Sequence, residues 1–261
     1  VSNRGSLLAD ATGASGNGGA VSVLADAIRL APTSVISANA LNRGNGGTIS
    51  VKSTTSTYAA GTISANGGAV SGNGGLIETS SAGVVTFDPN LKISTSAPNG
   101  KVGQWLVDPL DLTIDAAAAR ILSNALGSSN VVLDASASAC LGLGSCSLSS
   151  VASLTIAAGA DITSSNPFTT LSLLASGGVI NLNSTIQVGA FSATADVINV
   201  NASASVVTMG VPNSGGIALV GGSINILGLL NSSGQTSGGS GSTSTTYSCL
   251  LYTSPSPRDG L

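Results

Sequence analysis

Apolar and polar residues alternate in the N-terminal part of the chain, in blocks that recur every 28 residues. Each block opens with Gly-Asn-Gly-Gly, which begins at Gly16, Gly44 and Gly72. Five residues into each block stands a β-branched apolar residue followed by a polar one; these apolar residues are Val21, Ile49 and Ile77. Alternation with a period of two predicts strands that turn one face inward.

A block of this length has room for three short strands and the turns between them, which is one coil of a parallel β-helix. Equivalent strands of successive coils would then stack about 4.8 Å apart. The middle strand is the least regular part of the repeat, because Ile28, Ser56 and Val84 do not match one another. The pattern therefore predicts an all-β fold of stacked three-strand coils.

The repeat also predicts where side chains point. Val21, Ile49 and Ile77 are expected to stack inside the coils, whereas Glu78 is expected to point to solvent. One asparagine of each block falls at a glycine-rich bend, where glycine permits a positive φ. The side-chain amides of these residues would bond along the stack and form a ladder of Asn17, Asn45 and Asn73.

The strict period lapses after Gly100, but strand-like runs continue beyond it. These runs predict further, less regular coils, and they lie at residues 153–157, 170–175, 178–186, 197–201 and 216–227. One Ala-rich run at residues 115–126 differs, because Asp115 is a suitable N-cap and Gly127 is a stop signal. A short helix that caps or flanks the solenoid is expected there.

The composition fits coils better than a compact globular domain. Of the 261 residues, 7% are charged and 3% aromatic, whereas 35 are glycine, so a conventional core would lack large side chains. Disorder would require low hydropathy and high net charge, but the mean hydropathy is +0.43 and the formal net charge is −3. We expect a truncated incoming coil (1–15), regular coils (16–99), less regular coils with the helix (100–230), a flexible Gly/Ser/Thr-rich segment (231–248) and an unrelated tail (249–261).

The tail departs in composition from the residues before it, with two prolines, an arginine and an aspartate in its second half. Its sequence resembles the conceptual translation of a sequencing adapter, and we therefore leave it out of the fold prediction. The chain begins at Val1 without a methionine. We accordingly expect the natural protein to extend beyond both ends.

Charge and composition also limit the chemistry. The chain has no His, which excludes Ser-His-Asp triads and His-containing zinc sites. Its eight Lys and Arg residues are scattered, which argues against a nucleic-acid partner. No run of about 20 apolar residues predicts a membrane span.

Carboxylates grouped on one face would be needed for a carbohydrate-active β-helix such as a lyase or a glycosidase. The candidates are Asp88, Asp108, Asp111 and Asp115. The first two precede prolines and suit turns, and Asp115 suits an N-cap, so Asp111 alone lacks a structural role. We therefore predict no enzymatic activity, no metal and no cofactor, with the carbohydrate-active enzyme and a ligand-binding solenoid as alternatives.

Three further residues invite a functional interpretation. Cys140 and Cys146 could close a small disulfide loop, as suits an exported protein, or could be two buried thiols. Two cysteines are too few for a structural zinc site. Trp105 is the single tryptophan, and we expect it to fill the interior where the regular coils end rather than to stack on a ligand.

Two runs of the sequence carry a family likeness. Residues 74–80, Gly-Gly-Leu-Ile-Glu-Thr-Ser, resemble the signature G-G-x-[VI]-E-T-S, and Ile-Ser-Ala-Asn-Gly-Gly at residues 63–68 precedes it as in that family. Residues 103–109, Gly-Gln-Trp-Leu-Val-Asp-Pro, followed by Leu-Thr-Ile, resemble G-x-W-L-x-D-P-x-x-x-x-I. In this order the motifs resemble the filamentous-haemagglutinin-like exoproteins of two-partner secretion systems, and the matching residues are Glu78, Thr79, Ser80, Trp105, Asp108 and Pro109.

The resemblance implies a right-handed parallel β-helix that is exported unfolded through an outer-membrane two-partner transporter. It also implies display on the outer surface of a Gram-negative bacterium and adhesion to a host or surface receptor that the sequence does not name. The resemblance is strong over about residues 16–132 and generic beyond them, and the secretion domain and effector module of whole family members are not recognised in this chain. We therefore expect a structural shaft segment of a larger adhesin.

Overall fold

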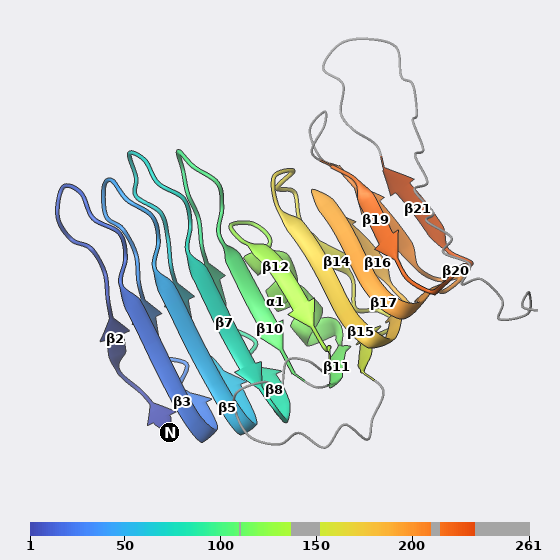
Figure 1. The fold of residues 1–261 in the computed structure, drawn as a ribbon, viewed down its shortest axis with the longest axis horizontal. Coiled ribbons are helices and arrows are strands. Elements are labelled where there is room, and N and C mark those ends of the chain that lie inside the picture. The colour runs from blue at the N-terminus through green and yellow to red at the C-terminus, as the bar shows by residue number, and fades with distance from the viewer. Residues whose placement is uncertain (110, 137–151, 210–214, 233–261) are drawn as a thin grey trace, which may run out of the picture.

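The computed structural model describes residues 1–109, 111–136, 152–209 and 215–232. Over these residues the chain winds into a parallel β-solenoid, whose successive coils stand side by side (Figure 1). The predicted fold class, a parallel β-helix with one short helix, is confirmed.

The strands form three faces. A 13-stranded sheet covers the first and second faces and contains β1 (Ser2–Asn3), β3 (Ala20–Leu30), β5 (Thr48–Ala59), β7 (Leu76–Ser81), β8 (Val84–Phe87), β10 (Gln104–Asp108), β11 (Asp111–Ile114), β12 (Asn130–Asp134), β13 (Ser153–Ile156), β15 (Thr170–Leu182), β17 (Ala190–Val200), β19 (Ile217–Val220) and β20 (Ser223–Ile226). Two four-stranded sheets form the third face: β2 (Ser6–Leu8), β4 (Val35–Ser37), β6 (Thr62–Ser64) and β9 (Lys92–Ser94), then β14 (Ile162–Thr163), β16 (Thr185–Val188), β18 (Ser205–Thr208) and β21 (Leu229–Ser232).

On the first face, residues that are 28 positions apart in the sequence pair with each other on successive strands. Val21 pairs with Ile49, and Ile49 pairs with Ile77, on β3, β5 and β7. Ile49 and Ile77 are fully buried, whereas Val21 is half-buried in the first complete coil. These residues therefore stack inside the coils.

The irregular middle strand has a structural cause. The register of β3 against β5 shifts after Ala25, so Ile28 pairs with Thr57 rather than with Ser56. Thr57 in turn pairs with Val85. All three side chains are buried, and the Thr57 hydroxyl donates a hydrogen bond to the carbonyl oxygen of Ser80, 2.9 Å away. The bulge adds one residue to the repeat, so comparison at a strict 28-residue interval did not align these stacked, inward-facing side chains.

The later strand predictions lie close to the observed strands. The runs at 170–175 and 178–186 are mostly one continuous strand, β15, that covers two faces, and residues 216–227 contain β19 and β20. β21 ends at Ser232, so the first two residues of the segment expected to be flexible belong to a strand. Residues 233–261, which include the rest of that segment and the tail, lie outside the described residues.

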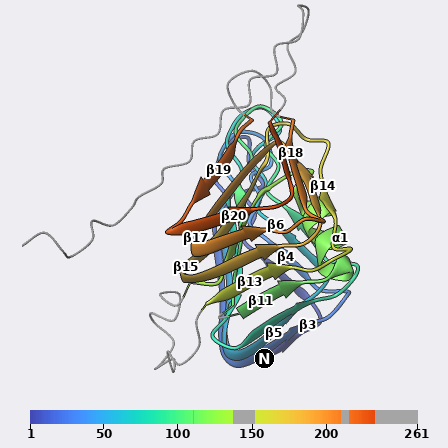
Figure 2. The ribbon, with the colours of Figure 1, turned by 90° about the vertical axis from the view of Figure 1, so that its right-hand side faces the viewer.

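The helix α1 (Ala116–Ala125) takes the place of a strand on the third face. Asp115 is its N-cap, and its Oδ1 accepts a hydrogen bond of 2.8 Å from the backbone N–H of Ala118. Gly127 does not adopt the left-handed conformation of a typical glycine stop. The helix contacts both β9 and β14, and it thereby separates the two four-stranded sheets. Seen along the solenoid, α1 lies on the same side as β14 (Figure 2).

The core is a narrow column of aliphatic side chains between the faces. One hydrophobic cluster continues from Ile28 to Leu219 through successive coils. Trp105 and Phe191 are its largest fully buried members. Small and β-branched residues suffice in such a column because each coil shares its interior with the next.

Candidate functional site

The two motif runs, far apart in sequence, lie on adjacent coils. β7 and β10 pair in parallel, so that Thr79 is opposite Val107 and Ser80 is opposite Asp108. Pro109 follows directly and is buried at the end of β10. The family-motif residues therefore form one continuous patch that crosses the sheet from its inner to its outer side.

On the inner side, Trp105 is fully buried. Its Nε1–H donates a hydrogen bond of 3.0 Å to the Thr79 hydroxyl, and its ring meets Phe87 edge to face with centroids 5.5 Å apart. Because no part of the indole reaches the surface, Trp105 fills the interior and is not available to stack on an exposed ligand.

On the outer side, Glu78 is more covered than the sequence suggested. Its side chain is 12% exposed, and its Oε1 lies 2.8 Å from Lys52 Nζ. The Ser80 hydroxyl donates a second bond of 3.0 Å to the same oxygen. The strand alternation places Glu78 on the outer face, as expected, and Lys52 of the preceding coil extends across it.

Asp108 lies on the same outer face, and its carboxyl group has few favourable partners. Burial, followed by the negative charges of Asp134 and Glu78, raises the pKa of Asp108 to about 7, while Lys52 acts in the opposite direction. Its Oδ1 is buried and has no hydrogen-bond partner among the described residues. Asp108 and Asp134 directly follow the paired residues Val107 and Leu133, so their Cα atoms lie about 4.8 Å apart on neighbouring strands.

A carboxyl group whose pKa lies at about 7, beside a second carboxylate, is able to exchange a proton with a substrate near neutral pH. Asp108 is therefore the strongest catalytic candidate in the described chain. Within those residues, no group of three or more acidic or thiol side chains is arranged to hold a metal ion.

The other predicted carboxylate candidates are engaged in local structure. Asp88 accepts hydrogen bonds from the Tyr58 hydroxyl and the Asn90 backbone N–H, each 2.8 Å long, and these bonds, the Asn90 bond first, lower its pKa. Asp111 was expected to lack a structural role, but its Oδ1 accepts a bond of 3.2 Å from the Ser153 backbone N–H and joins β11 to β13. Asp115 caps α1.

The asparagines of the repeat form a ladder, with a different bonding pattern from the one expected. The Oδ1 atoms of Asn17 and Asn45 accept bonds of 2.8 Å from the backbone N–H groups of Asn45 and Asn73, and Asn73 Oδ1 accepts one of 2.9 Å from Lys101. The side-chain amides therefore do not bond to one another. Each side chain instead satisfies a backbone donor at the bend of the next coil.

Three further sets of coil-to-coil bonds were not foreseen. Asp10 and Asn39 accept bonds from the backbone N–H groups of Asn39 and Asn66, at spacings of 29 and 27 residues that a strict 28-residue search misses. Direct amide-to-amide bonds of 2.6 to 2.9 Å occur only in the later coils of the described chain, between Asn181, Asn199 and Asn225 and between Asn183 and Asn201. For Asn181, Asn199 and Asn225, an apolar residue on each side of the asparagine would have been the usable signal.

Some predicted features are not placed by the structure. Cys140 and Cys146 lie outside the described residues, so the disulfide remains a prediction. The described residues contain one helix, α1, and it lacks the length and apolar character required to cross a bilayer.

The described residues form a parallel β-solenoid. Near the motifs, polar side chains connect successive coils through the Trp105–Thr79 hydrogen bond and the Lys52–Glu78 ion pair. No family model, no curated protein and no solved structure matches the chain.

Proposed function

We propose that this chain is a structural shaft segment of a secreted, surface-displayed bacterial adhesin that mediates attachment or haemagglutination. The observation that carries the proposal is the parallel ladder of the first face, which passes from β3 through β5, β7, β10, β12, β15 and β17 to β19. A solenoid of this kind gains length by adding coils, and each coil needs only its neighbours for stability. Such a shaft increases the distance between its two ends.

The motif residues support the same proposal. Trp105 and Thr79 join adjacent coils through the interior, and Lys52 and Glu78 join adjacent coils on the outside. Residues that hold coils together are what a shaft requires, and three of these four, Glu78, Thr79 and Trp105, also match the exoprotein signatures. Export through an outer-membrane two-partner transporter, followed by folding on the outer surface of a Gram-negative bacterium, belongs to this proposal, with a host or surface receptor as the partner.

Coil-by-coil contacts also suit folding after export. Paired strands of successive coils are about one repeat apart in sequence, so each new coil can dock on the previous one without distant segments. A chain that leaves a transporter in order could fold progressively in this way.

Surface display of an epitope-tagged chimera tests the proposal. The described segment would be placed behind a two-partner secretion domain, with its transporter, and the tag would be probed on intact cells with antibody and protease. We expect an exposed, protease-resistant rod, and duplication of residues 16–99 should move the tag further from the cell. Failure to reach the surface while the secretion domain alone does so would contradict it.

A carbohydrate-active enzyme is the second candidate, and Asp108 is the observation in its favour. Purified protein would be assayed against a panel of polysaccharides for hydrolase and lyase products, beside Asp108→Asn and the remote charge control Asp26→Asn. We expect no turnover from any of the three proteins. Turnover that is lost in Asp108→Asn and kept in Asp26→Asn would replace the shaft by an enzyme.

A further inference from the structure

The second face of the solenoid is open between β8 and β11, although these strands belong to successive coils. Among the described strands, β8 pairs with β5, and β11 pairs with β13, while their facing edges have no strand between them. Nearly all pairs of Cα atoms, one from each strand, are more than 8 Å apart. Paired strands would lie about 4.8 Å apart, so β8 and β11 are not paired with each other.

The helix explains the opening. α1 belongs to the same coil as β11 and lies between β9 and β14. A helix with its side chains is about 10 Å across, roughly twice the spacing of paired strands. It therefore holds the coils apart on the third and second faces, while β7 and β10 remain paired on the first face.

Both edges of the opening present free backbone groups. The N–H groups of Ala82 and Asp88 donate to β5, at 2.9 and 2.8 Å. Because alternate residues of a strand direct their N–H and C=O groups to opposite sides, those of Val85 and Phe87 point into the opening. On β11, Ile114 bonds to β13 through its carbonyl oxygen, so Thr113 directs its groups into the opening from the other edge.

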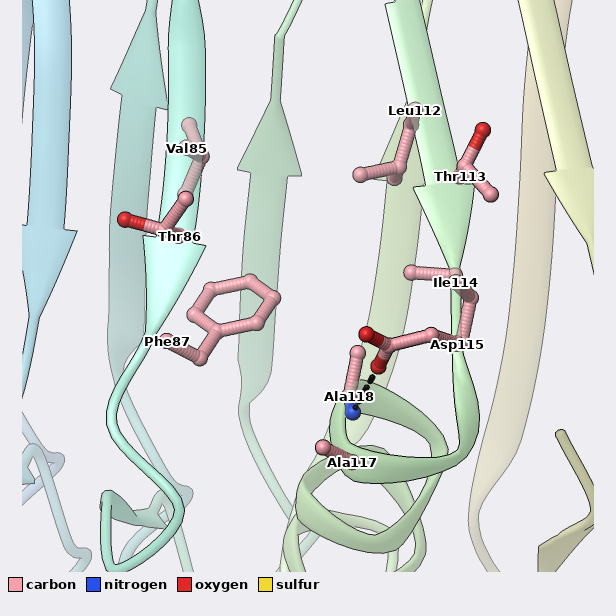
Figure 3. Close-up of a pocket in the computed structure, with 9 residues that line it drawn as sticks. All are labelled: Val85, Thr86, Phe87, Leu112, Thr113, Ile114, Asp115, Ala117 and Ala118. Carbon is pink, nitrogen blue, oxygen red and sulfur yellow. Dashed lines mark hydrogen bonds between the residues drawn. The ribbon is translucent and has the colours of Figure 1, made fainter.

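A cavity of about 210 Å³ occupies the opening (Figure 3). Its inner wall is apolar, its rim carries two threonines, and α1 contributes its first turn; the lining residues are Val85, Thr86, Phe87, Leu112, Thr113, Ile114, Asp115, Ala117 and Ala118. Asp111, the first residue of β11, and Asp115, the N-cap of α1, are both exposed, and no Lys or Arg lines the cavity. The opening therefore combines unpaired strand edges, a small apolar interior and a negative rim.

We propose that the opening binds an extended basic peptide segment of a partner protein, which enters as an additional strand between β8 and β11. Backbone hydrogen bonds to both edges would provide affinity, as in other cases of strand addition. Small apolar side chains at alternate positions would enter the cavity, and Lys or Arg at the positions between them would face Asp111 and Asp115. A sugar or another ligand without a peptide backbone could not satisfy both edges in this way.

A fluorescein-labelled hexapeptide of alternating Val and Lys is the probe, and the same peptide with Glu in place of Lys is its control. Fluorescence anisotropy with the purified chain should show saturable binding of the Lys peptide and at least tenfold weaker binding of the Glu peptide. Amide hydrogen exchange should slow at Val85, Phe87 and Thr113 on binding. Thr86 already bonds to β5 and should not change.

Two variants separate charge from backbone effects. Asp111→Asn combined with Asp115→Asn keeps acceptors for Ser153 and Ala118 but removes both charges, and binding should weaken about tenfold. Asp26→Asn, an exposed carboxylate on a distant coil, should leave it unchanged. Thr113→Pro removes one donor of the open edge, where proline is tolerated, and should weaken binding of the Lys peptide without loss of the circular dichroism of the fold.

Three results would overturn the proposal. The first is no saturable binding by the unmodified chain, and the second is protection confined to the strand edges at the two ends of the solenoid. The third is binding that appears only after residues 137–151 are shortened, since the chain itself would then be the competitor for the opening.

Discussion

Asp108→Asn is expected to stabilise the protein at neutral pH and to flatten the pH dependence of its stability. Burial raises the pKa of Asp108 to about 7 from its ordinary 3.8. Between these two values the folded state holds a proton that the unfolded chain releases. The free energy of unfolding therefore falls as the pH rises through this window, and the penalty is complete above the folded pKa.

The magnitude follows from the width of the window. Each unit of pKa difference corresponds to about 1.4 kcal/mol, and about three units would give about 4 kcal/mol. Asp108 is only partly buried, so solvent screening reduces the expected effect to about 2 kcal/mol. The amide of Asn has the same shape and no charge, so the variant should gain this amount above pH 7 and nothing below about pH 4. Hydrogen bonds lower the pKa values of Asp88 and Asp161, but both proteins share that contribution.

Urea unfolding followed by circular dichroism, at constant ionic strength and at a series of pH values from about 4 to about 8, measures the difference. Asp26→Asn serves as the matched control, because Asp26 is exposed and accepts one hydrogen bond of 3.0 Å from the Thr54 hydroxyl, which Asn can also accept. Equal slopes of stability against pH for the unmodified protein and Asp108→Asn would refute the reasoning.

Three other substitutions probe the coil contacts. Gly44→Ala should cost about 3 kcal/mol, because Gly44 has a φ of 140° and a Cβ there would collide with the carbonyl oxygen of the coil below, whereas Gly5→Ala, with open space around it, should be neutral in the same thermal melt. Trp105→Phe should cost about 2 kcal/mol in urea unfolding by leaving the Thr79 hydroxyl without its donor, and an unchanged midpoint would disprove that contact. Asn45→Ala should cost about 1 kcal/mol, and Asn45→Asp, which keeps the acceptor, should recover most of it.

The repeat was sufficient to predict how successive coils stack. Identical residues at a fixed interval must become vertical neighbours once strands pair in register, so Ile49 and Ile77 could be placed inside, and Asn45 and Asn73 at one bend, before any coordinates were known. The helix was also readable, because an N-cap side chain acts within its own first turn.

The candidate site was less predictable. Sequence reasoning ranked Asp111 above Asp108, since Asp108 precedes a proline and suits a turn, but the fold gives Asp111 a backbone partner and leaves a buried oxygen of Asp108 without one. The covering of Glu78 by Lys52 was likewise invisible, because it depends on a long side chain that leans from the preceding coil.

The sequence by itself thus determined the local features: strand alternation, the position of the glycine bends, the helix and the register of like residues. Tertiary structure decided which side chains became buried, because burial depends on neighbours from other coils and on the space that α1 opens between β8 and β11. The one-residue shift after Ala25 illustrates the difference between what sequence and tertiary structure decide. A strict 28-residue period aligns Ile28 with Ser56, whereas the folded chain pairs Ile28 with Thr57 and buries both side chains.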